Sequence, residues 1–370
     1  MVKRIVLTGG PGSGKTSVLG KIEQVFSAQG YKVIVVDETA TYLINKGIKP
    51  FGDGALSMVD FQEIVMKLQL AKEDVIDRAI EMMPDENVIV VYDRGIIDNS
   101  AYINQEELFE VLSRINNVKS VSDLMNKYDL VINLVGSKDF YTTENNKARS
   151  EDISEALDLG NRTLKAWLGH KLLKIVLPKE TLDDKIREVL NIINELLKSK
   201  HVKRQEKYLV DFSRSDLSQI INNGKSMEIE QTYLISEDDV EKRIRRIIFN
   251  GYTSYYFSVF KIMENGDKVI VSEKEIDYGI YNSLLEFKDN NRCIIRKKRY
   301  YFTYDGQYFS LDVFENESEM GILEINIVEG EKVNIPSFIS VIENVTDNKN
   351  FLNKNIAMEN EIRKKVKIND

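Results

Sequence analysis

Residues 9–16 read Gly-Gly-Pro-Gly-Ser-Gly-Lys-Thr, and this stretch decides the fold of the first half of the chain. It fits the pattern G-x-x-x-x-G-K-[ST] of a phosphate-binding loop. Residues 4–8 form a short, mostly apolar run suited to a buried strand, and apolar side chains recur at helical spacing after the loop. Strand, glycine-rich turn and helix is the context that such a loop requires. The stretch therefore predicts a nucleotide site, the alternative being a glycine-rich turn without a ligand.

The loop has a clear physical division of labour. Its glycines let successive backbone N–H groups point into one concavity, and the helix that follows adds the positive end of its dipole. Lys15 is expected to reach the β- and γ-phosphates, and the Thr16 hydroxyl to bind Mg²⁺. The expected cofactors are Mg²⁺ and ATP or GTP, because no Asn-Lys-x-Asp motif marks a guanine site. The predicted nucleotide-binding residues are Gly9, Gly10, Pro11, Gly12, Ser13, Gly14, Lys15 and Thr16.

Length and composition restrict the class of protein. A chain of 370 residues predicts two domains, and 42% hydrophobic with 30% charged residues is typical of a globular protein. The net charge of −8 argues against non-specific nucleic-acid binding. A single cysteine and two histidines disfavour an internal disulfide and a zinc site. No apolar run is long enough for a transmembrane segment, and the first residues lead directly into a strand, so we expect a cytoplasmic protein.

Strand-like and helix-like segments alternate through residues 1–198, which predicts a three-layer α/β domain with a parallel sheet. Residues 199–225 lose this rhythm and are interpreted as a connecting segment. Residues 226–370 form the second predicted domain. The strands expected in the first domain are 4–8, 31–36, 87–92, 130–135 and 172–177, with helices over 60–82 and 181–198.

Polar side chains follow these strands at the edge where ligands bind. Asp93 ends a strand, as does a Walker-B acid that holds Mg²⁺. Arg94 is expected to hold substrate or phosphate, or to form a strand-end salt bridge, and Asp93-Arg94-Gly95 resembles a signature of nucleoside and nucleotide kinases. Glu38 is either a base for an acceptor hydroxyl or a plain helix N-terminal acid. Arg149, within the basic segment 145–151, is expected to close over the phosphates. With Lys15, these are the predicted catalytic residues.

The second domain is rich in β-branched and aromatic residues. Strands are expected at 227–235, 252–262, 268–276, 293–304, 307–314 and 321–328, and a helix at 238–248. Charged residues on one face of long strands predict a closed antiparallel barrel with a charged interior. Glu228 and Glu230, which share a strand face, are candidates to hold a metal with Glu324, the alternative being carboxylates that are simply solvated on an exposed strand. The predicted ligand-binding residues of this interior are Arg243, Arg245, Lys261, Lys297, Arg299 and Asp312.

The second domain resembles the CYTH, or triphosphate-tunnel, family, whose first strand carries Glu-x-Glu-x-Lys. Glu228 and Glu230 match, Thr232 stands at the lysine position, and the closing Glu-x-Glu appears as Glu324 and Asn326. The whole chain is similar to the group that joins a NadR-like P-loop domain to a CYTH-like domain, of which the TRPL-translocation-defect proteins of animals are named members. The marks of this resemblance are residues 9–16, 93–95, 146–151, Trp167 with His170, 228–234, 273–276, 296–300 and 307–314.

The resemblance implies ATP or GTP in the first domain and a phosphorylated ligand in the second: polyphosphate, a nucleotide or an acidic phospholipid. Three functions follow. The first is a nucleotide-binding protein with slow hydrolysis, coupled to the second ligand. The second is a small-molecule kinase for an acceptor such as a nucleoside or nicotinamide riboside. The third is a tunnel triphosphatase, which Thr232 and Asn326 disfavour because they remove a charge on the phosphate chain and a metal ligand.

Overall fold

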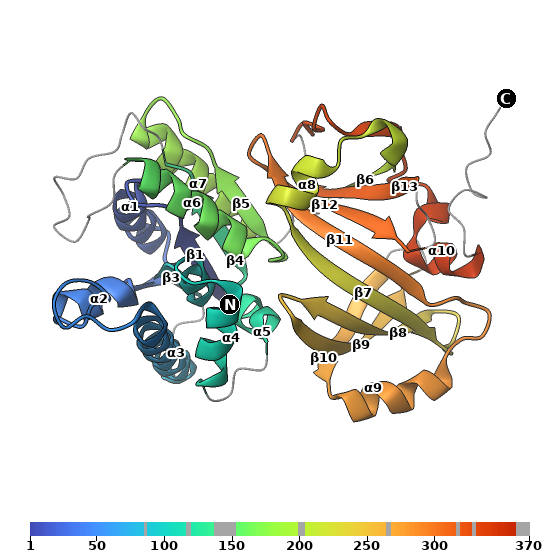
Figure 1. Ribbon diagram of the computed structural model, residues 1–370, viewed down its shortest axis with the longest axis horizontal. Helices are drawn as coiled ribbons and strands as arrows, with labels where there is room; N and C mark the ends of the chain where they lie inside the picture. The colour runs from blue at the N-terminus through green and yellow to red at the C-terminus, as the bar shows by residue number, and fades with distance from the viewer. Residues whose placement is uncertain are drawn as a thin grey trace. The chain divides into compact units, whose positions relative to one another are not determined.

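The computed structural model describes residues 1–84, 87–115, 120–136, 153–198, 204–263, 268–315, 319–327 and 331–359. The chain divides into two compact units, Met1–His201 and Val202–Asp370, and Figure 1 colours them along the sequence. Within the described ranges, no helix has both the length and the apolar character needed to cross a membrane.

The first unit is built on a five-stranded sheet with the order β2-β3-β1-β4-β5, in which every pair of neighbours is parallel. This confirms the predicted α/β class. The strands are β1 (Val2–Thr8), β2 (Lys32–Val36), β3 (Val88–Asp93), β4 (Leu130–Leu134) and β5 (Leu173–Val176). The helices are α1 (Lys15–Ala28), α2 (Thr39–Asn45), α3 (Met58–Met82), α4 (Gln105–Ser113), α5 (Val121–Asn126), α6 (Ile153–Trp167) and α7 (Leu182–Leu197), with a 3₁₀ turn η1 (Ile96–Ala101).

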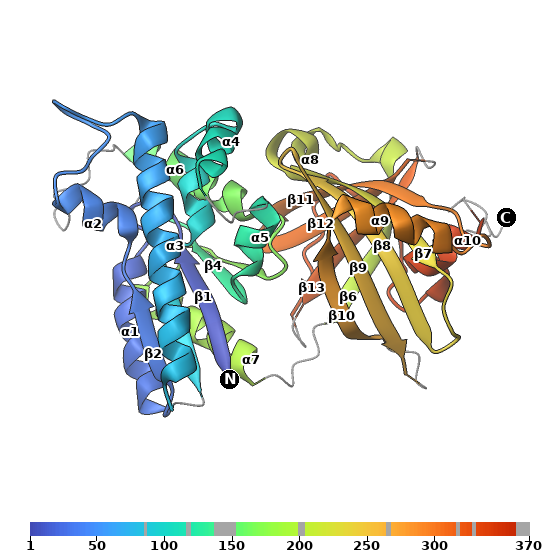
Figure 2. The same ribbon diagram turned by 90° about the horizontal axis from the view of Figure 1, so that it is seen from below.

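Both faces of this sheet are covered, because its strands alternate apolar side chains on two sides. On one face, Ile5 and Leu7 of β1 pack with α1 and α7 in a single apolar core. On the other, Arg4 of β1 forms an ion pair with Asp77 of α3 at 2.6 Å. Figure 2 shows the length of α3 beside the sheet. The C-terminal ends of β1, β2 and β3 remain open to the loops that follow them.

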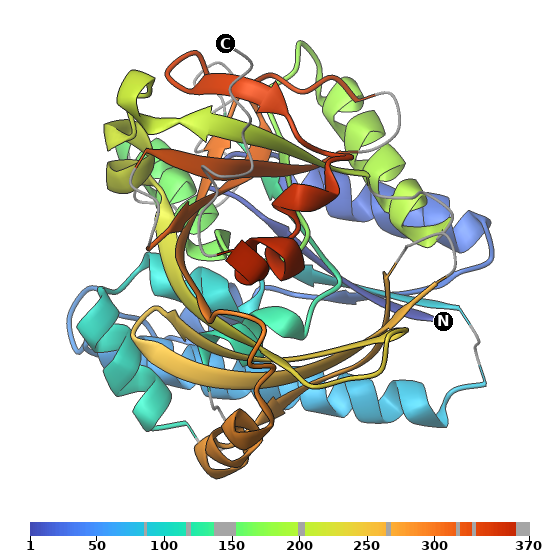
Figure 3. The same ribbon diagram turned by 90° about the vertical axis from the view of Figure 1, so that its right-hand side faces the viewer.

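The second unit is a nine-stranded antiparallel sheet with the order β10-β9-β8-β7-β11-β12-β13-β6-β14. Figure 3 shows its strong curvature, with α10 lying inside the curve. The strands are β6 (Arg204–Asp211), β7 (Lys225–Leu234), β8 (Val240–Phe249), β9 (Tyr252–Ile262), β10 (Lys268–Ile276), β11 (Ile295–Tyr304), β12 (Gln307–Phe314), β13 (Met320–Ile327) and β14 (Ser340–Asn344). The helices are α8 (Ser218–Asn223), α9 (Tyr278–Leu284) and α10 (Asn353–Glu359), with 3₁₀ turns η3 (Phe212–Arg214), η4 (Leu285–Phe287) and η5 (Lys349–Phe351).

The mainly antiparallel character of this unit was predicted correctly, but its closure was not. Among the described strands the sheet is open, with β10 and β14 as its edges. The alternation of charged and apolar residues predicts a charged face, and it contains no information on whether two edges meet. The concave side of the sheet instead packs against Val345, Phe351 and Ile356 from the C-terminal segment.

Two segments differ from the sequence prediction. Residues 238–248 were expected to be helical and instead form most of β8. Ile244 and Ile247 have helical spacing, but they are buried on opposite faces of a strand that is covered on both sides. The expected connecting segment 199–225 contains β6, which pairs with both β13 and β14. Leu209 and Val210 of β6 are completely buried in two different cores, so both faces of this strand are covered as well.

Candidate functional site

The phosphate-binding loop connects β1 to α1 and presents backbone N–H groups at the start of a helix. Gly14 caps α1 in the left-handed region, with φ of 91°, which few side chains tolerate. Gly10 approaches α6 so closely that a Cβ would lie 2.8 Å from the Ala156 carbonyl oxygen and 2.9 Å from the Cα of Gly160. Glycine is therefore required at both positions, and the loop has the geometry of an anion site.

Two lysines hold the loop. The Nζ of Lys15 donates to the carbonyl oxygens of Gly9, at 2.9 Å, and Gly10, at 3.2 Å. The Nζ of Lys185, on α7, donates to those of Ser13, at 2.9 Å, and Val135, at 2.7 Å. Burial lowers the pKa of each lysine to about 8.

Lys185 was not predicted from the sequence. Its signal was a lysine among the apolar positions of the helix expected over 181–198, where it lies three residues after Leu182 and one before Ile186. A polar residue at such a position is buried by the helix and needs a partner, which the loop carbonyls supply.

A cavity of about 590 Å³ opens beside the loop. Residues 11–16 of the loop line one part of the cavity, and the segment after β5 contributes Pro178, Lys179, Thr181, Leu182 and Lys185. Glu38 after β2 and the Asp93–Arg94 turn after β3 line the middle. Side chains of α2 and α3 line the remainder. The structure thus brings five predicted residues of the first unit around one space: Lys15, Thr16, Glu38, Asp93 and Arg94.

The oxygen donors of this cavity fit Mg²⁺. Because β3 pairs directly with β1, Asp93 lies opposite Leu7, next to the start of the loop. The Oδ1 atom of Asp93 is buried and has no hydrogen-bond partner in the part of the chain that the structure describes, and burial raises the pKa of the Asp93 carboxyl to about 6. Thr16 is exposed in the first turn of α1. A carboxylate and a hydroxyl are oxygen ligands of the kind that Mg²⁺ prefers.

Arg94 and Glu38 form an ion pair, with 2.7 Å between the arginine Nε and a glutamate oxygen. Burial opposes ionisation of Glu38, but the charges of Arg94 and Lys15 hold its pKa below the ordinary value. Arg94 has φ of 68°, a strained conformation that other contacts must hold. Its N–H donates to the Leu7 carbonyl at 3.1 Å, and its own carbonyl accepts from Gln69 at 3.3 Å. The Nη1 atom of Arg94 is buried with no hydrogen-bond partner among the described residues, so the ion pair does not use the whole guanidinium group.

Buried aromatic and polar side chains support this turn from below. Asp98 accepts from the Gly95 N–H at 2.7 Å and from the Thr8 hydroxyl. Trp167 is fully buried, with its ring 5.6 Å from that of Tyr128 and 5.9 Å from that of His170. Trp167 and His170, which are among the marks of the family resemblance, therefore pack beside the site. The predicted Arg149 and the segment 145–151 lie outside the described residues.

In the second unit, the strand register places a cluster of charged side chains on the face that carries α10, which we call the inner face. Lys297 donates to Asp312 at 2.5 Å, and Arg299 forms two bonds to the same carboxylate at 2.5 and 2.7 Å. Arg299 also reaches Glu324 at 2.8 Å, and Lys207 reaches it at 2.9 Å. Burial opposes ionisation of both acids, but Arg299 holds the pKa of Asp312 and of Glu324 below their ordinary values.

Arg243 and Arg245 lie on the same inner face, opposite Tyr233 and Gln231 of β7. Arg245 pairs with Glu273 at 2.7 Å. The guanidinium carbon of Arg243 lies 4.4 Å from the centre of the Phe260 ring. Within the described ranges of this unit, both arginines have a buried Nε without a hydrogen-bond partner. Burial, together with the charge of Arg243, lowers the pKa of Arg245. Neighbouring cations with unused donors are typical of an anion site.

Three predicted residues of this unit lie elsewhere. Glu228, Glu230 and Lys261 are on the outer face, because the register alternates them with inner-face residues. Glu230 accepts from Arg296 at 2.8 Å and from Tyr281 at 3.2 Å. The expected metal site of Glu228, Glu230 and Glu324 is therefore not formed, since Glu324 faces the other way. Sequence reasoning missed Lys207, which lay in the expected connecting segment.

Residues 4–185 match the family model described as the AAA domain. Solved structures similar to the chain include the hypothetical protein NE1496, with 25% identity over 42% of this chain and 98% of that one, at a TM-score of 0.32. A second is the inorganic triphosphatase NE1496, with 24% identity over 42% and 96%, at 0.31. The PH1819 protein of Pyrococcus horikoshii OT3 has 18% identity over 33% and 78%, at 0.26. No curated protein matches the chain. These TM-scores are too low to support a conclusion about the fold. The fold of the second unit is established by its own strand pairing.

Proposed function

We propose that the first unit binds a purine nucleoside triphosphate with Mg²⁺ at residues 9–16 and transfers its γ-phosphoryl group to a hydroxyl acceptor. The observation that carries this proposal is that one cavity contains both the loop and the Glu38–Arg94 pair. The match of residues 4–185 to the AAA domain supports the nucleotide-binding part. The space beyond the pair, lined by α2 and α3, favours transfer to an acceptor over slow hydrolysis alone.

Each residue has a role that its position permits. The loop N–H groups and Lys15 hold the β- and γ-phosphates, and Thr16 and Asp93 would hold the metal. A Mg²⁺ ion held there would supply positive charge to offset the charge that develops on the phosphates. Glu38, which is ionised in the free protein, accepts the proton of the acceptor hydroxyl. At the same time the oxygen of that hydroxyl forms a bond to the γ-phosphorus. The bond to the β-phosphate oxygen breaks, the nucleoside diphosphate leaves, and Arg94 stabilises the transferred group.

The test is acceptor-dependent formation of nucleoside diphosphate, measured with a panel of hydroxyl compounds. In Glu38→Gln, we expect the acceptor-dependent rate to fall by about 10²- to 10⁴-fold, the range for loss of a general base. Binding of the Mg-nucleotide should change by less than about threefold in this variant, since Glu38 contacts the acceptor. The control is Glu23→Gln, an exposed carboxylate on α1. If nucleotide binds but no acceptor of any class raises turnover, transfer is wrong and a nucleotide-binding protein is the better account.

The inner face of the second unit favours a further function, which we propose to be binding of a phosphorylated anion. The observation is the pair Arg243 and Arg245, whose Nε donors are buried and unused. Asp312 and Glu324, by contrast, already accept bonds from buried cations, so these acids support anion binding better than metal-dependent hydrolysis. Polyphosphate, a nucleotide and the headgroup of an acidic phospholipid all carry the required charge.

A further inference from the structure

The part of the cavity formed by α2 and α3 differs in character from the loop side. Phe51, Phe61 and Val65 give it apolar walls, and Gln62 and Gln69 contribute amides. Among the described lining residues between positions 39 and 69, none carries a charge. A space with apolar walls and a few fixed polar groups is typical of a site for a small organic ligand.

Among the described residues of this wall, Gln62 has a buried amide carbonyl that lacks a partner. The residue is 3% exposed, and its Oε1 atom accepts no hydrogen bond within the described residues. Its amide nitrogen contacts the sulfur of Met58, at 3.6 Å. Gln69, two turns later, is fully engaged: it donates to the carbonyl of Arg94 and accepts from Asn99, each at 3.3 Å. A buried acceptor without a donor is destabilising, so Gln62 is set to receive a donor from a ligand.

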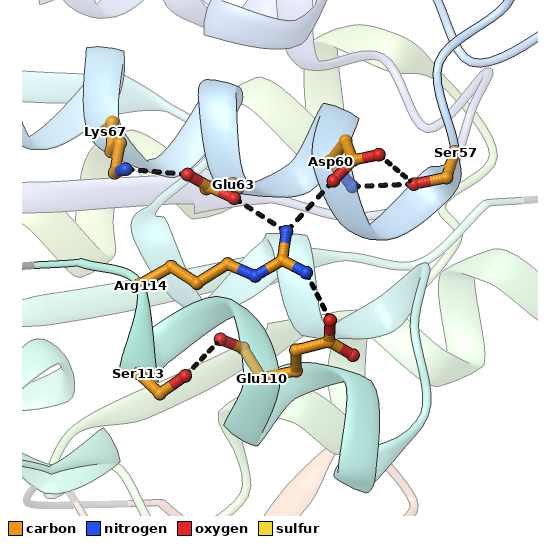
Figure 4. Close-up of polar contacts among 7 residues, drawn as sticks. All are labelled: Ser57, Asp60, Glu63, Lys67, Glu110, Ser113 and Arg114. Atoms are coloured by element: carbon orange, nitrogen blue, oxygen red, sulfur yellow. Dashed lines mark hydrogen bonds and ion pairs between the residues drawn. The ribbon is translucent and has the colours of Figure 1, made fainter.

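The surrounding structure holds Gln62 in place. Ser57 caps α3 by accepting from the N–H of Asp60 at 3.1 Å. Arg114, at the end of α4, bridges Asp60 and Glu63, each at 2.9 Å, and also contacts Glu110 (Figure 4). This network ties the first turns of α3 to α4. The backbone that carries Gln62 is therefore anchored before a ligand arrives, and the burial of its side chain restricts where the carbonyl can lie.

The charges of the described lining residues favour an acceptor without a phosphate of its own. Arg94 is paired with Glu38 through its Nε atom, and its remaining donors face the side of the cavity where the γ-phosphoryl group is transferred in the proposed function. Of the lysines, Lys15 belongs to the phosphate-binding loop, and Lys185 is bonded to the loop carbonyls. Lys179 pairs with Glu188 at 2.6 Å. Within the described lining, a phosphate on the acceptor would thus lose its hydration and find no cation on the wall formed by α2 and α3.

We infer that the acceptor is an uncharged hydroxyl compound with a planar or apolar body, and that Gln62 selects it by accepting a hydrogen bond from it. The inference rests on the proposed transferase function and names the class of its acceptor. Gln62 is a specificity residue, since the proton transfer and the phosphoryl transfer take place at Glu38 and Arg94. Phe61 and Val65, on the same face of α3, provide the surface against which the body lies.

The experiment compares nucleosides with their own 5′-monophosphates, which differ by one phosphate. Binding is measured by calorimetry with the loop filled by a non-hydrolysable Mg-nucleotide, and turnover by release of nucleoside diphosphate. We expect at least one nucleoside to bind and its monophosphate to bind at least about 30-fold more weakly. Gln62→Met, which keeps the volume and removes the carbonyl, should raise the acceptor Kd and KM by about 10- to 100-fold and change kcat by less than about threefold.

Two controls separate recognition from folding. Gln105→Met alters an exposed glutamine at the start of α4 and should change neither constant. The free Gln62→Met protein should melt at or above the wild-type temperature, because the unpartnered carbonyl is gone. A lower melting temperature together with an unchanged Kd would assign Gln62 to structure and overturn the inference.

The outcomes also separate this inference from the proposed function. If only phosphorylated acceptors are turned over, the transferase stands and the inference is wrong. If nucleosides bind in a manner that depends on Gln62 but none is phosphorylated, the pocket assignment stands and the transferase is wrong. If no uncharged compound binds, the inference fails whatever the nucleotide does.

Discussion

The sharpest test of the nucleotide site is Lys15→Met, which keeps the aliphatic stem and removes the ammonium group. The Nζ of Lys15 already lies against the loop, 2.9 Å from the Gly9 carbonyl and 3.2 Å from that of Gly10. It therefore needs little rearrangement to meet a bound phosphate. Unit charges about 4 Å apart interact by about 4 kcal/mol at an effective dielectric constant of about 20.

The expected loss follows from this contact. Part of the attraction offsets the two carbonyl bonds that the ammonium gives up, which leaves about 2–4 kcal/mol, or about a 30- to 1,000-fold increase in the Kd of the Mg-nucleotide. At a ligand concentration of about 100 Kd, the wild type gains about 2.7 kcal/mol. For a unit of about 200 residues this is a rise of about 5–11 °C in Tm. A variant bound 100-fold more weakly gains about 0.4 kcal/mol, or about 1–2 °C, at the same concentration.

The free variant behaves differently from the bound one. Removing a buried ammonium relieves its desolvation and also removes two hydrogen bonds, so the Tm without nucleotide should move by no more than about 2 °C. Calorimetry gives the Kd, and thermal melts with and without Mg-nucleotide give the shift. The control is Lys21→Met, an exposed lysine on the same helix that contacts Gln24. An unchanged Kd would refute the assignment of the loop, and a large fall in the Tm of the free protein would make Lys15 a structural residue.

Two further predictions concern the inner face of the second unit. Asp312→Ala leaves Lys297 and Arg299 without their shared carboxylate, so we expect urea denaturation to show a loss of about 3–5 kcal/mol. Arg299 and Lys297 hold the pKa of Asp312 below its ordinary 3.8, so the contribution of Asp312 to the free energy of unfolding is complete above about pH 4. The difference in the free energy of unfolding between wild type and variant should therefore narrow as the pH falls further, and a difference that stays constant would contradict this. Arg243→Gln should weaken the binding of tripolyphosphate or short-chain phosphatidic acid, measured by calorimetry, at least about tenfold. Lys261→Gln, on the outer face, should leave this binding unchanged, and equal effects of the two substitutions would refute the inner-face site.

The first unit was largely predictable because its signals are local. A phosphate-binding loop needs glycines, a lysine and a hydroxyl at fixed positions between a strand and a helix, and residues 9–16 meet these requirements in sequence order. The polar residues Glu38 and Asp93 follow apolar runs, and parallel strands bring their C-terminal ends to one edge. Gln62 gave no such signal. It lies in a helix with an ordinary amphipathic pattern, and only the packed structure shows that its carbonyl has no partner.

The second unit was harder to predict because a strand carries two faces and the sequence does not say which is inside. Glu228 and Glu230 alternate with Met227 and Ile229, and the local sequence allows either pair to face the interior. The register with β11 decides it, since Ile229 lies opposite Lys297. This pairing joins residues far apart in the chain, so no local pattern encodes it.

The distribution of unpartnered polar atoms connects the two units to their proposed ligands. In the inner-face network of the second unit, Asp312 and Glu324 have their cations, and folding alone accounts for them. Around the cavity of the first unit, buried side-chain atoms of Ser13, Gln62, Asp93 and Arg94 have no hydrogen-bond partner within the described residues, and each such atom is destabilising by about 1–3 kcal/mol. These four residues line one cavity, which also includes the strained backbone turn at Arg94. A bound nucleotide, a metal, a transferred phosphoryl group and an acceptor would supply partners for atoms that folding leaves unsatisfied. The same reasoning applied to Arg243 explains why it, rather than the fully paired Lys297, is the residue to mutate first in the search for the second ligand.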